Sequence, residues 1–191
     1  MSLTSPKSLL DVTIPESVRK ELNEYAEHVY EQGVYVTRKN KAVEIHGSGN
    51  SRVVVSHPSV DDLTDEYNMV VKFALSNDED TKIDGITQNE VELYIDSHST
   101  KLSAYTLPVI DNDKSSKPKW IVYPLVEVAT EDTVSELYQP WEELEQKGFV
   151  DTELFELRNW GFWNYQSYLI DFGFFNENPE CESINITNKI Y

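Results

Sequence analysis

The sequence predicts an α+β fold, in which a mostly antiparallel, twisted sheet with a helix packed on it joins a small helical and hairpin lobe. Three observations predict this class: an amphipathic helical pattern near the start, short apolar segments separated by turn residues, and further helical patterns between those segments. With 191 residues, the chain suits one large domain or two small lobes that share a core.

The first predicted element is a helix beginning near Pro15. Proline suits a first helical position, Thr13 is a candidate cap, and Glu16 favours a helix N-terminus. Apolar residues then recur at three- and four-residue spacing up to Gly33: Val18, Leu22, Tyr25, Ala26 and Val29. This stripe favours a packing surface over a partner site, so residues 1–33 are expected to form an N-terminal helical extension.

Strand-like segments follow at residues 34–37, 42–46 and 52–56. The turn between the last two contains Gly47 and Gly49, and it is rich in residues that tolerate positive φ. The strongest strand signal is an apolar run at residues 67–75.

Lys72 interrupts that apolar run, and burying an unpaired ammonium is costly. It could lie on the solvent face with its stem on the sheet, or point into a cleft and meet an anion; its context favours the cleft. Residues 88–97 then predict a helix that carries Glu92. A glutamate there could hold Lys72 by an ion pair and leave N–H donors for phosphate oxygens, although Glu92 alone would suit a solvated helix face better.

The second half of the chain predicts more strands and another helix. Strands are expected at residues 105–110 and 120–123 with a turn at 111–114 between them, and an extended segment at 124–128. A helix interrupted at Pro140 is expected at 131–146. The motif Asn159-Trp160-Gly161 precedes a turn at 163–166, a strand at 167–170 and Asp171-Phe172-Gly173. The aromatic cluster around this motif favours a hydrophobic core over a stacking platform.

Four short pieces in this order resemble the protein-kinase-like superfamily: Val70-Val71-Lys72-Phe73-Ala74, Glu92, Asn159-Trp160-Gly161 and Ile170-Asp171-Phe172-Gly173. The pattern is also similar to short, degenerate kinase-like proteins of phages and halophilic archaea. The resemblance covers about residues 34–175. It implies a kinase-like N-lobe and hinge at residues 34–128 and a truncated C-lobe at 129–191, with motifs like the catalytic loop and the Asp-Phe-Gly metal motif.

The resemblance also implies a site for ATP and Mg²⁺. Gly47 and Gly49 would lie in the loop that covers the phosphates, Lys72 would contact the phosphates, and Glu92 would hold Lys72. The hinge at residues 124–128 would take the adenine edge. The metal ligands implied are Asn159 and Asp171.

Departures from the kinase pattern concern catalysis. Kinase catalytic loops place an aspartate five residues before the asparagine, and here Leu154 stands there. Glu153 or Glu156 could substitute, although each reads more simply as surface. Only 18 residues follow Gly173, too few for an activation segment and a substrate platform.

We therefore assign no catalytic residue from the sequence and expect a degenerate kinase-like protein, or pseudokinase, that binds ATP and Mg²⁺ without efficient phosphotransfer. Two alternatives stay open: an atypical active phosphotransferase with a displaced carboxylate, and a non-catalytic acidic interaction protein that keeps only the fold.

Composition limits the partners. The chain has 34 acidic and 16 basic residues, a formal charge of −18, which disfavours nucleic-acid binding through a broad basic face. The acids are spread along the chain, which favours adaptation to high salt over a footprint for a basic protein partner. We expect no membrane span and a cytoplasmic protein, because no long apolar run and no signal-peptide pattern occur. Cys181 is the single cysteine, and the four histidines lack metal-ligand spacing.

Overall fold

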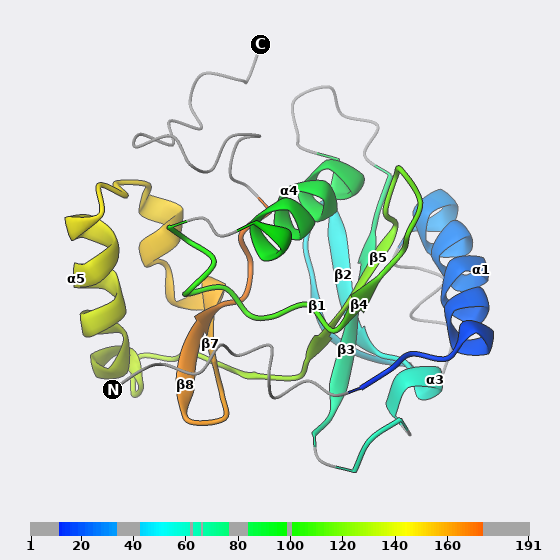
Figure 1. The fold of residues 1–191 in the computed structure, drawn as a ribbon, viewed down its shortest axis with the longest axis horizontal. Coiled ribbons are helices and arrows are strands. Elements are labelled where there is room, and N and C mark those ends of the chain that lie inside the picture. Colours follow the sequence, from blue (N-terminus) through cyan, green and yellow to red (C-terminus); the bar gives the residue numbers. More distant parts are fainter. Residues whose placement is uncertain are drawn as a thin grey trace. The chain divides into compact units, whose positions relative to one another are not determined.

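The computed structural model describes residues 12–33, 43–61, 63–65, 67–76, 84–98 and 101–173. The architecture is α+β, as expected (Figure 1). The chain divides into two compact units, each made of two segments: Met1–Asn89 with Pro108–Leu125, and Glu90–Leu107 with Val126–Tyr191. The predicted strand at 34–37 and the tail that contains Cys181 lie outside the described residues.

The first unit is built on a five-stranded antiparallel sheet. Its strand order is β1-β2-β3-β5-β4, so the strongest predicted strand is central. The strands are β1 (Glu44–Ser48), β2 (Arg52–Ser56), β3 (Met69–Ala74), β5 (Trp120–Pro124) and β4 (Asp111–Asn112).

Helix α1 (Glu16–Gln32) covers one face of this sheet (Figure 1). Its buried residues Leu22, Ala26 and Val29 belong to the predicted stripe, and they pack in one core with alternate residues of β2, β3 and β5. Pro15 stands just before the helix rather than at its first position, and Gly33 ends it with φ of 69°, a conformation that glycine adopts without strain. The short helix α3 (Pro58–Asp61) lies in the connector that the sequence predicts to be irregular.

The predicted strand at residues 105–110 is wrong. Within that segment Thr106 forms an isolated parallel bridge to Leu169, while the predicted turn residues Asp111 and Asn112 form β4. Arg19 binds the Asp111 carboxylate at 2.7 Å, which fixes the edge strand beside α1. The turn therefore lies further along the chain, where the carboxylate of Asp113 accepts backbone N–H groups at 2.9 Å.

The second unit contains a small antiparallel sheet, of strand order β6-β7-β8, and several helices. Helix α4 (Gly85–Ser97) begins in the first unit and continues into the second. The other elements are β6 (Glu127–Val128), the 3₁₀ segments η2 (Val134–Leu137), η3 (Thr152–Phe155) and η4 (Leu157–Asn159), α5 (Tyr138–Gln146), β7 (Trp160–Trp163) and β8 (Gln166–Leu169).

The core of the second unit joins α4, α5 and the hairpin of β7 and β8. Trp160, Leu169 and Phe172 are completely buried in it, together with Leu154. The expectation that the aromatic residues near Asn159 form core is therefore confirmed for Trp160, Tyr168 and Phe172, and it is wrong for Tyr165, which is fully exposed in the hairpin loop.

Two local predictions for the second unit needed correction. The helix expected at 131–146 is a 3₁₀ segment followed by α5, which begins at Tyr138; Pro140 then falls in the first turn, where a missing N–H breaks no helical hydrogen bond. Strand β7 was not predicted. The predicted turn is confirmed, and Asn164 and Tyr165 have the positive φ values, 49° and 61°, of a tight hairpin loop.

Among the described residues, no helix combines the length and apolar character that crossing a membrane requires.

Candidate functional site

Lys72 is buried in the central strand β3 of the first unit. Its residue is 7% exposed, and antiparallel pairing sets it opposite Val54 of β2 and Ile121 of β5. The neighbours Val71 and Phe73 face α1, so Lys72 faces the other side of the sheet. Its Nζ lies 4.7 Å from the centroid of the Tyr123 ring, a cation–π contact. Lys72 therefore does not lie on a solvent face.

Both glycines were predicted to lie in a turn, but only Gly49 does, because Gly47 lies within strand β1, opposite Val54 of β2. Pairing shifts register between Ile45 and Gly47, and the Gly49 N–H donates to the Arg52 carbonyl at 2.9 Å. A Cβ added at Gly47 would meet no described atom within 4 Å, and at Gly49 it would meet only the Arg52 oxygen at 3.9 Å. Packing within the described residues therefore does not require glycine at either position.

Glu92 is completely buried on α4 in the second unit. Its carboxylate accepts the backbone N–H of Phe172 at 3.3 Å. The solvated-face alternative is thereby excluded for Glu92. This hydrogen bond links the helix to the Asp171-Phe172-Gly173 motif, 80 residues away in sequence.

Asn159 ends η4 and is 4% exposed. Its Nδ2 donates to the Glu153 carbonyl at 2.8 Å, so Oδ1 is the side-chain atom available to a cation. The Asn159 carbonyl accepts the N–H of Ile170 at 2.7 Å. Asn159 and Asp171 therefore lie at the same end of the β7–β8 hairpin, opposite its turn.

The other residues of the Asn159 motif have packing roles. The Trp160 indole N–H donates to the Leu154 carbonyl at 2.6 Å. A Cβ at Gly161 would lie 2.6 Å from Cγ2 of Val126 and 3.0 Å from the Glu127 carbonyl oxygen, so a larger residue there would force Val126 or strand β6 to shift.

Three of the predicted site residues thus meet within the second unit: Glu92, Asn159 and Asp171. Asp171 is partly exposed. Lys72, Gly47 and Gly49 belong to the first unit. The ion pair between Lys72 and Glu92 stays a prediction.

The two glutamates that the sequence suggests as substitutes for a kinase catalytic aspartate, Glu153 and Glu156, are both ion-paired. Leu154 is completely buried in the core. Arg158 binds the Glu153 carboxylate at 3.2 Å through Nη2 and the Glu156 carboxylate at 2.6 Å through Nε. Neither glutamate resembles a free proton acceptor in this arrangement.

No group of three or more His, Cys, Asp or Glu side chains within the described ranges could hold a metal ion. A nucleotide-bound Mg²⁺ does not require such a group, because one or two protein carboxylates together with phosphates and waters complete its coordination. The carboxylate of Asp171 and the amide oxygen of Asn159 are oxygen ligands of the kind that Mg²⁺ prefers.

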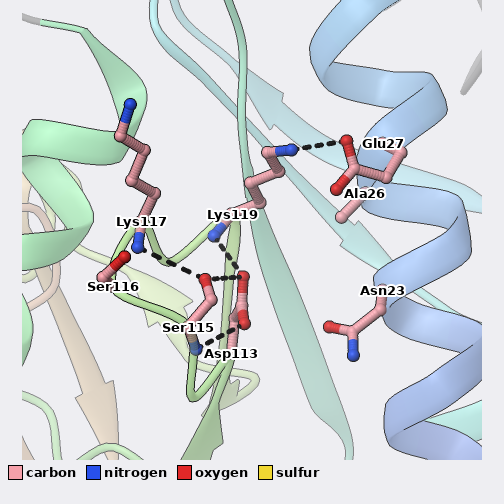
Figure 2. Close-up of a pocket in the computed structure, with 8 residues that line it drawn as sticks. All are labelled: Asn23, Ala26, Glu27, Asp113, Ser115, Ser116, Lys117 and Lys119. Atoms are coloured by element: carbon pink, nitrogen blue, oxygen red, sulfur yellow. Dashed lines mark hydrogen bonds and ion pairs between the residues drawn. The ribbon is translucent and has the colours of Figure 1, made fainter.

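A cavity of about 390 Å³ lies between α1 and the turn before β5 in the first unit (Figure 2). None of the predicted site residues lines it. Its charged groups are largely paired with one another: the Lys119 ammonium binds the Glu27 carboxylate, and Asp113 caps the turn through Ser115. Figure 2 shows the Lys117 side chain extending away from α1. The cavity therefore offers few groups for a ligand.

Sequence reasoning missed several buried polar residues of the first unit, among them Asn89 and Arg52. Asn89 of α4 is completely buried and donates to the Pro118 carbonyl at 2.9 Å. Arg52 begins β2 and is only 6% exposed. Strand alternation could have revealed the burial of Arg52. Arg52 and Val54 are two residues apart in β2 and therefore face the same side of the sheet, the side that Lys72 also faces.

No protein-family model matches the chain, and no curated protein shows significant similarity to it.

Proposed function

We propose that this protein is a degenerate kinase-like protein that binds ATP together with Mg²⁺ and transfers phosphate inefficiently or not at all. Lys72 would contact the phosphates, and Asn159 and Asp171 would hold the metal. Glu92 would orient the metal motif through Phe172 and bind Lys72.

The observation that carries this proposal is the hydrogen bond between Glu92 and the Phe172 N–H. The kinase resemblance predicts functional roles for a helix glutamate, a loop asparagine and an aspartate that are far apart in sequence. Hydrogen bonds connect Glu92 to Phe172 and Asn159 to Ile170 within the second unit, on either side of Asp171, and these contacts support the proposal.

The residues suit the ligand. The ammonium of Lys72 has three N–H donors, and lysine is a common phosphate ligand. When bound, Mg²⁺ bridges phosphate oxygens and neutralises their charge. Gly47 in β1 and Gly49 in the turn, which packing does not require to be glycine, would let the hairpin backbone approach phosphates closely.

The proposal of weak or absent phosphotransfer is supported by the lack of a suitable proton acceptor for the substrate hydroxyl near Asn159. The buried Leu154 cannot accept a hydroxyl proton, and Arg158 engages Glu153 and Glu156. A displaced general base therefore has little support from these contacts.

The test is thermal unfolding in high salt with and without ATP and Mg²⁺. At about a hundred times its Kd, a ligand of the folded state adds roughly 2.7 kcal/mol, which shifts the melting temperature of a chain of this size by about 5–11 °C. We expect this shift in the natural chain and its loss in Lys72→Met, which retains most of the buried stem.

The control is Lys20→Gln, which removes an exposed charge on α1. No shift in the natural chain would refute nucleotide binding and favour the non-catalytic interaction protein. Mg²⁺-dependent phosphate release that Asp171→Asn abolishes would instead establish an active phosphotransferase.

A further inference from the structure

The large apolar side chains that are exposed among the described residues all lie in the second unit: Val128, Tyr138, Val150 and Tyr165. Exposed apolar residues are ordinary when they stand singly, but Tyr138 belongs to a row of aromatic rings. The Tyr138 ring centroid lies 6.3 Å from that of Trp141, and the Trp141 centroid lies 6.0 Å from that of Phe155. The row therefore joins α5 to η3.

This aromatic row is packed on the core at one end and exposed at the other. Trp141 and Phe155 are partly buried and pack against the core of the second unit, whereas Tyr138 is 59% exposed. A tyrosine that rests on a packed ring loses little conformational freedom on binding, and tyrosine and tryptophan are enriched among the residues that dominate binding energy at interfaces. The row is therefore suited to contact with another protein.

Two glutamates lie beside these rings on α5. Glu142 follows Tyr138 by four residues, and residues at this spacing are neighbours on a helix surface. Glu145 follows Trp141 by the same spacing. Both glutamates are exposed, and neither forms an ion pair among the described residues. We call the following five residues the α5 face: Tyr138, Trp141, Glu142, Glu145 and Phe155.

The charge around the α5 face is strongly negative. Residues 126–157 include ten acidic residues and one basic residue, Lys147. Lys147 donates a hydrogen bond to the Tyr105 hydroxyl, which in turn donates to Glu143. Lys147 follows Tyr138 by nine residues, or about two and a half helical turns, so the two lie on opposite sides of the helix. The single basic residue of this segment therefore does not neutralise the α5 face.

The other charged contacts leave most acids of the segment unpaired. Arg158, just beyond it, engages Glu153 and Glu156, and Asp151 caps η3. Six exposed acids of the segment form no ion pair within the part of the chain that the structure describes: Glu127, Glu131, Asp132, Glu136, Glu142 and Glu145. This region therefore attracts cations and repels anions.

We propose that the α5 face is a docking surface for a basic amphipathic segment of a partner protein. Arginine or lysine side chains of the partner lie on the rings of Tyr138 and Trp141 and pair with the neighbouring glutamates, while its apolar side chains cover the aromatic row. Charge selects this partner, because nucleic acid, an anionic lipid surface and a second copy of this chain, with its charge of −18, are all repelled. The inference goes beyond the proposed function and does not depend on nucleotide binding.

Adaptation to salt does not account for this combination of rings and acids. It favours exposed carboxylates over the whole surface, but it gives no reason to expose aromatic rings beside them. Helix α1 shows the difference, because Lys20 pairs with Glu24 at 3.9 Å and Lys119 binds Glu27. No large apolar side chain of α1 is exposed.

The test is fluorescence anisotropy of a labelled synthetic peptide titrated with the full chain. The peptide is longer than about 15 residues and places leucine on one side of a helix and arginine on the other. One control peptide has the same composition in an order that breaks the apolar side, and another replaces every arginine by glutamate. We expect the first peptide to bind, to bind less tightly as KCl rises from about 0.1 to about 1 M, and to bind at least about tenfold more tightly than either control.

Matched variants assign the binding to the α5 face. Tyr138→Ser should weaken binding of the first peptide at least about fivefold, as the loss of an interface anchor does. Tyr165→Ser removes a fully exposed tyrosine from the hairpin loop and should change the affinity less than about twofold.

A second pair of variants tests the charges. Glu142→Gln combined with Glu145→Gln should weaken binding and reduce its dependence on salt. Glu24→Gln combined with Glu31→Gln makes the same charge change at exposed positions of α1 and should have little effect.

Several outcomes would overturn the proposal. These are no binding of the first peptide, equal binding of either control peptide, and equal effects of the α5 and α1 charge variants, which would show general charge attraction. An unchanged affinity in Tyr138→Ser would also overturn it. Self-association in sedimentation that Tyr138→Ser abolishes would assign the face to a second copy instead of a basic partner.

Circular dichroism verifies that the natural chain and each variant are folded at each salt concentration. If Tyr138→Ser does not fold, Tyr138→Lys decides, because lysine favours a helix and places a cation on the α5 face. Binding at least about tenfold weaker in Tyr138→Lys supports the proposal, and an unchanged affinity overturns it.

Discussion

Replacing Glu92 by alanine tests whether this carboxylate holds the Asp171-Phe172-Gly173 motif in place. The change leaves the buried Phe172 N–H without the carboxylate that accepts it at 3.3 Å. Hydrogen bonds to charged groups contribute about 1.5–3 kcal/mol. For a chain of this size, that loss lowers the melting temperature by about 3–12 °C.

Two variants isolate the hydrogen bond. Glu92→Gln keeps an acceptor of similar size, so we expect it to lose less than half as much stability as Glu92→Ala. Glu90→Ala removes an exposed glutamate from the same helix and should change the melting temperature little. Hydrogen exchange of the Phe172 amide supplies the local measurement, with protection lost in Glu92→Ala and largely retained in Glu92→Gln.

Equal melting temperatures for Glu92→Ala and Glu90→Ala would refute the reasoning. So would an unchanged protection of the Phe172 amide in Glu92→Ala, because that amide would then have another acceptor.

Four further predictions concern stability. Burial and the hydrogen bond to Glu143 raise the pKa of Tyr105, so the folded state retains a proton that the unfolded state loses above about pH 10. The free energy of unfolding, measured by urea titration, should therefore fall as the pH rises above about 10. Tyr105→Phe should remove this pH dependence. Burial lowers the pKa of His57, so the unfolded state binds a proton before the folded state does as the pH falls. The free energy of unfolding should therefore decrease below about pH 6.5, and His57→Asn should lack this pH dependence. Gly161→Ala should lower the free energy of unfolding by about 1–3 kcal/mol, because the added methyl overpacks against Val126 and Glu127. Gly49→Ala, whose added methyl would have its nearest neighbour at 3.9 Å, should lower it less. Equal losses for the two variants in denaturant unfolding would contradict the packing role of Gly161. The charge of −18 predicts a melting temperature that rises between 0.1 and 1 M KCl as the Debye length falls from about 10 to 3 Å, and no rise would argue against salt adaptation.

The periodic elements of the fold were predictable from the sequence. Helix α1 and strands β2 and β3 have strong apolar patterns, since each buries one or both faces against the core. The segment around Asp111 was not predictable. Local turn propensity favours a loop there, while backbone pairing with β5 makes the same residues an edge strand, in which Asp111 also binds Arg19 of α1.

The candidate site shows the same division. The apolar strand around Lys72 favoured a cleft over the solvent face, and its burial excludes the solvent face. The Asp-Phe-Gly motif drew attention to Asp171. The contact between Glu92 and Phe172 depends on tertiary packing, which one sequence does not encode in any local pattern. Arg52 was missed because an arginine at a strand start usually lies in solvent, and only its register with Lys72 reveals their common face.

The most direct test of the central claim is the affinity of ATP with and without Mg²⁺ in the natural chain, Lys72→Met and Asp171→Asn. We predict that Mg²⁺ strengthens binding to the natural chain, that Lys72→Met weakens binding under both conditions, and that Asp171→Asn removes the Mg²⁺ dependence alone. Equal affinities in all three proteins, or no binding to the natural chain, would contradict a nucleotide–metal site at these residues.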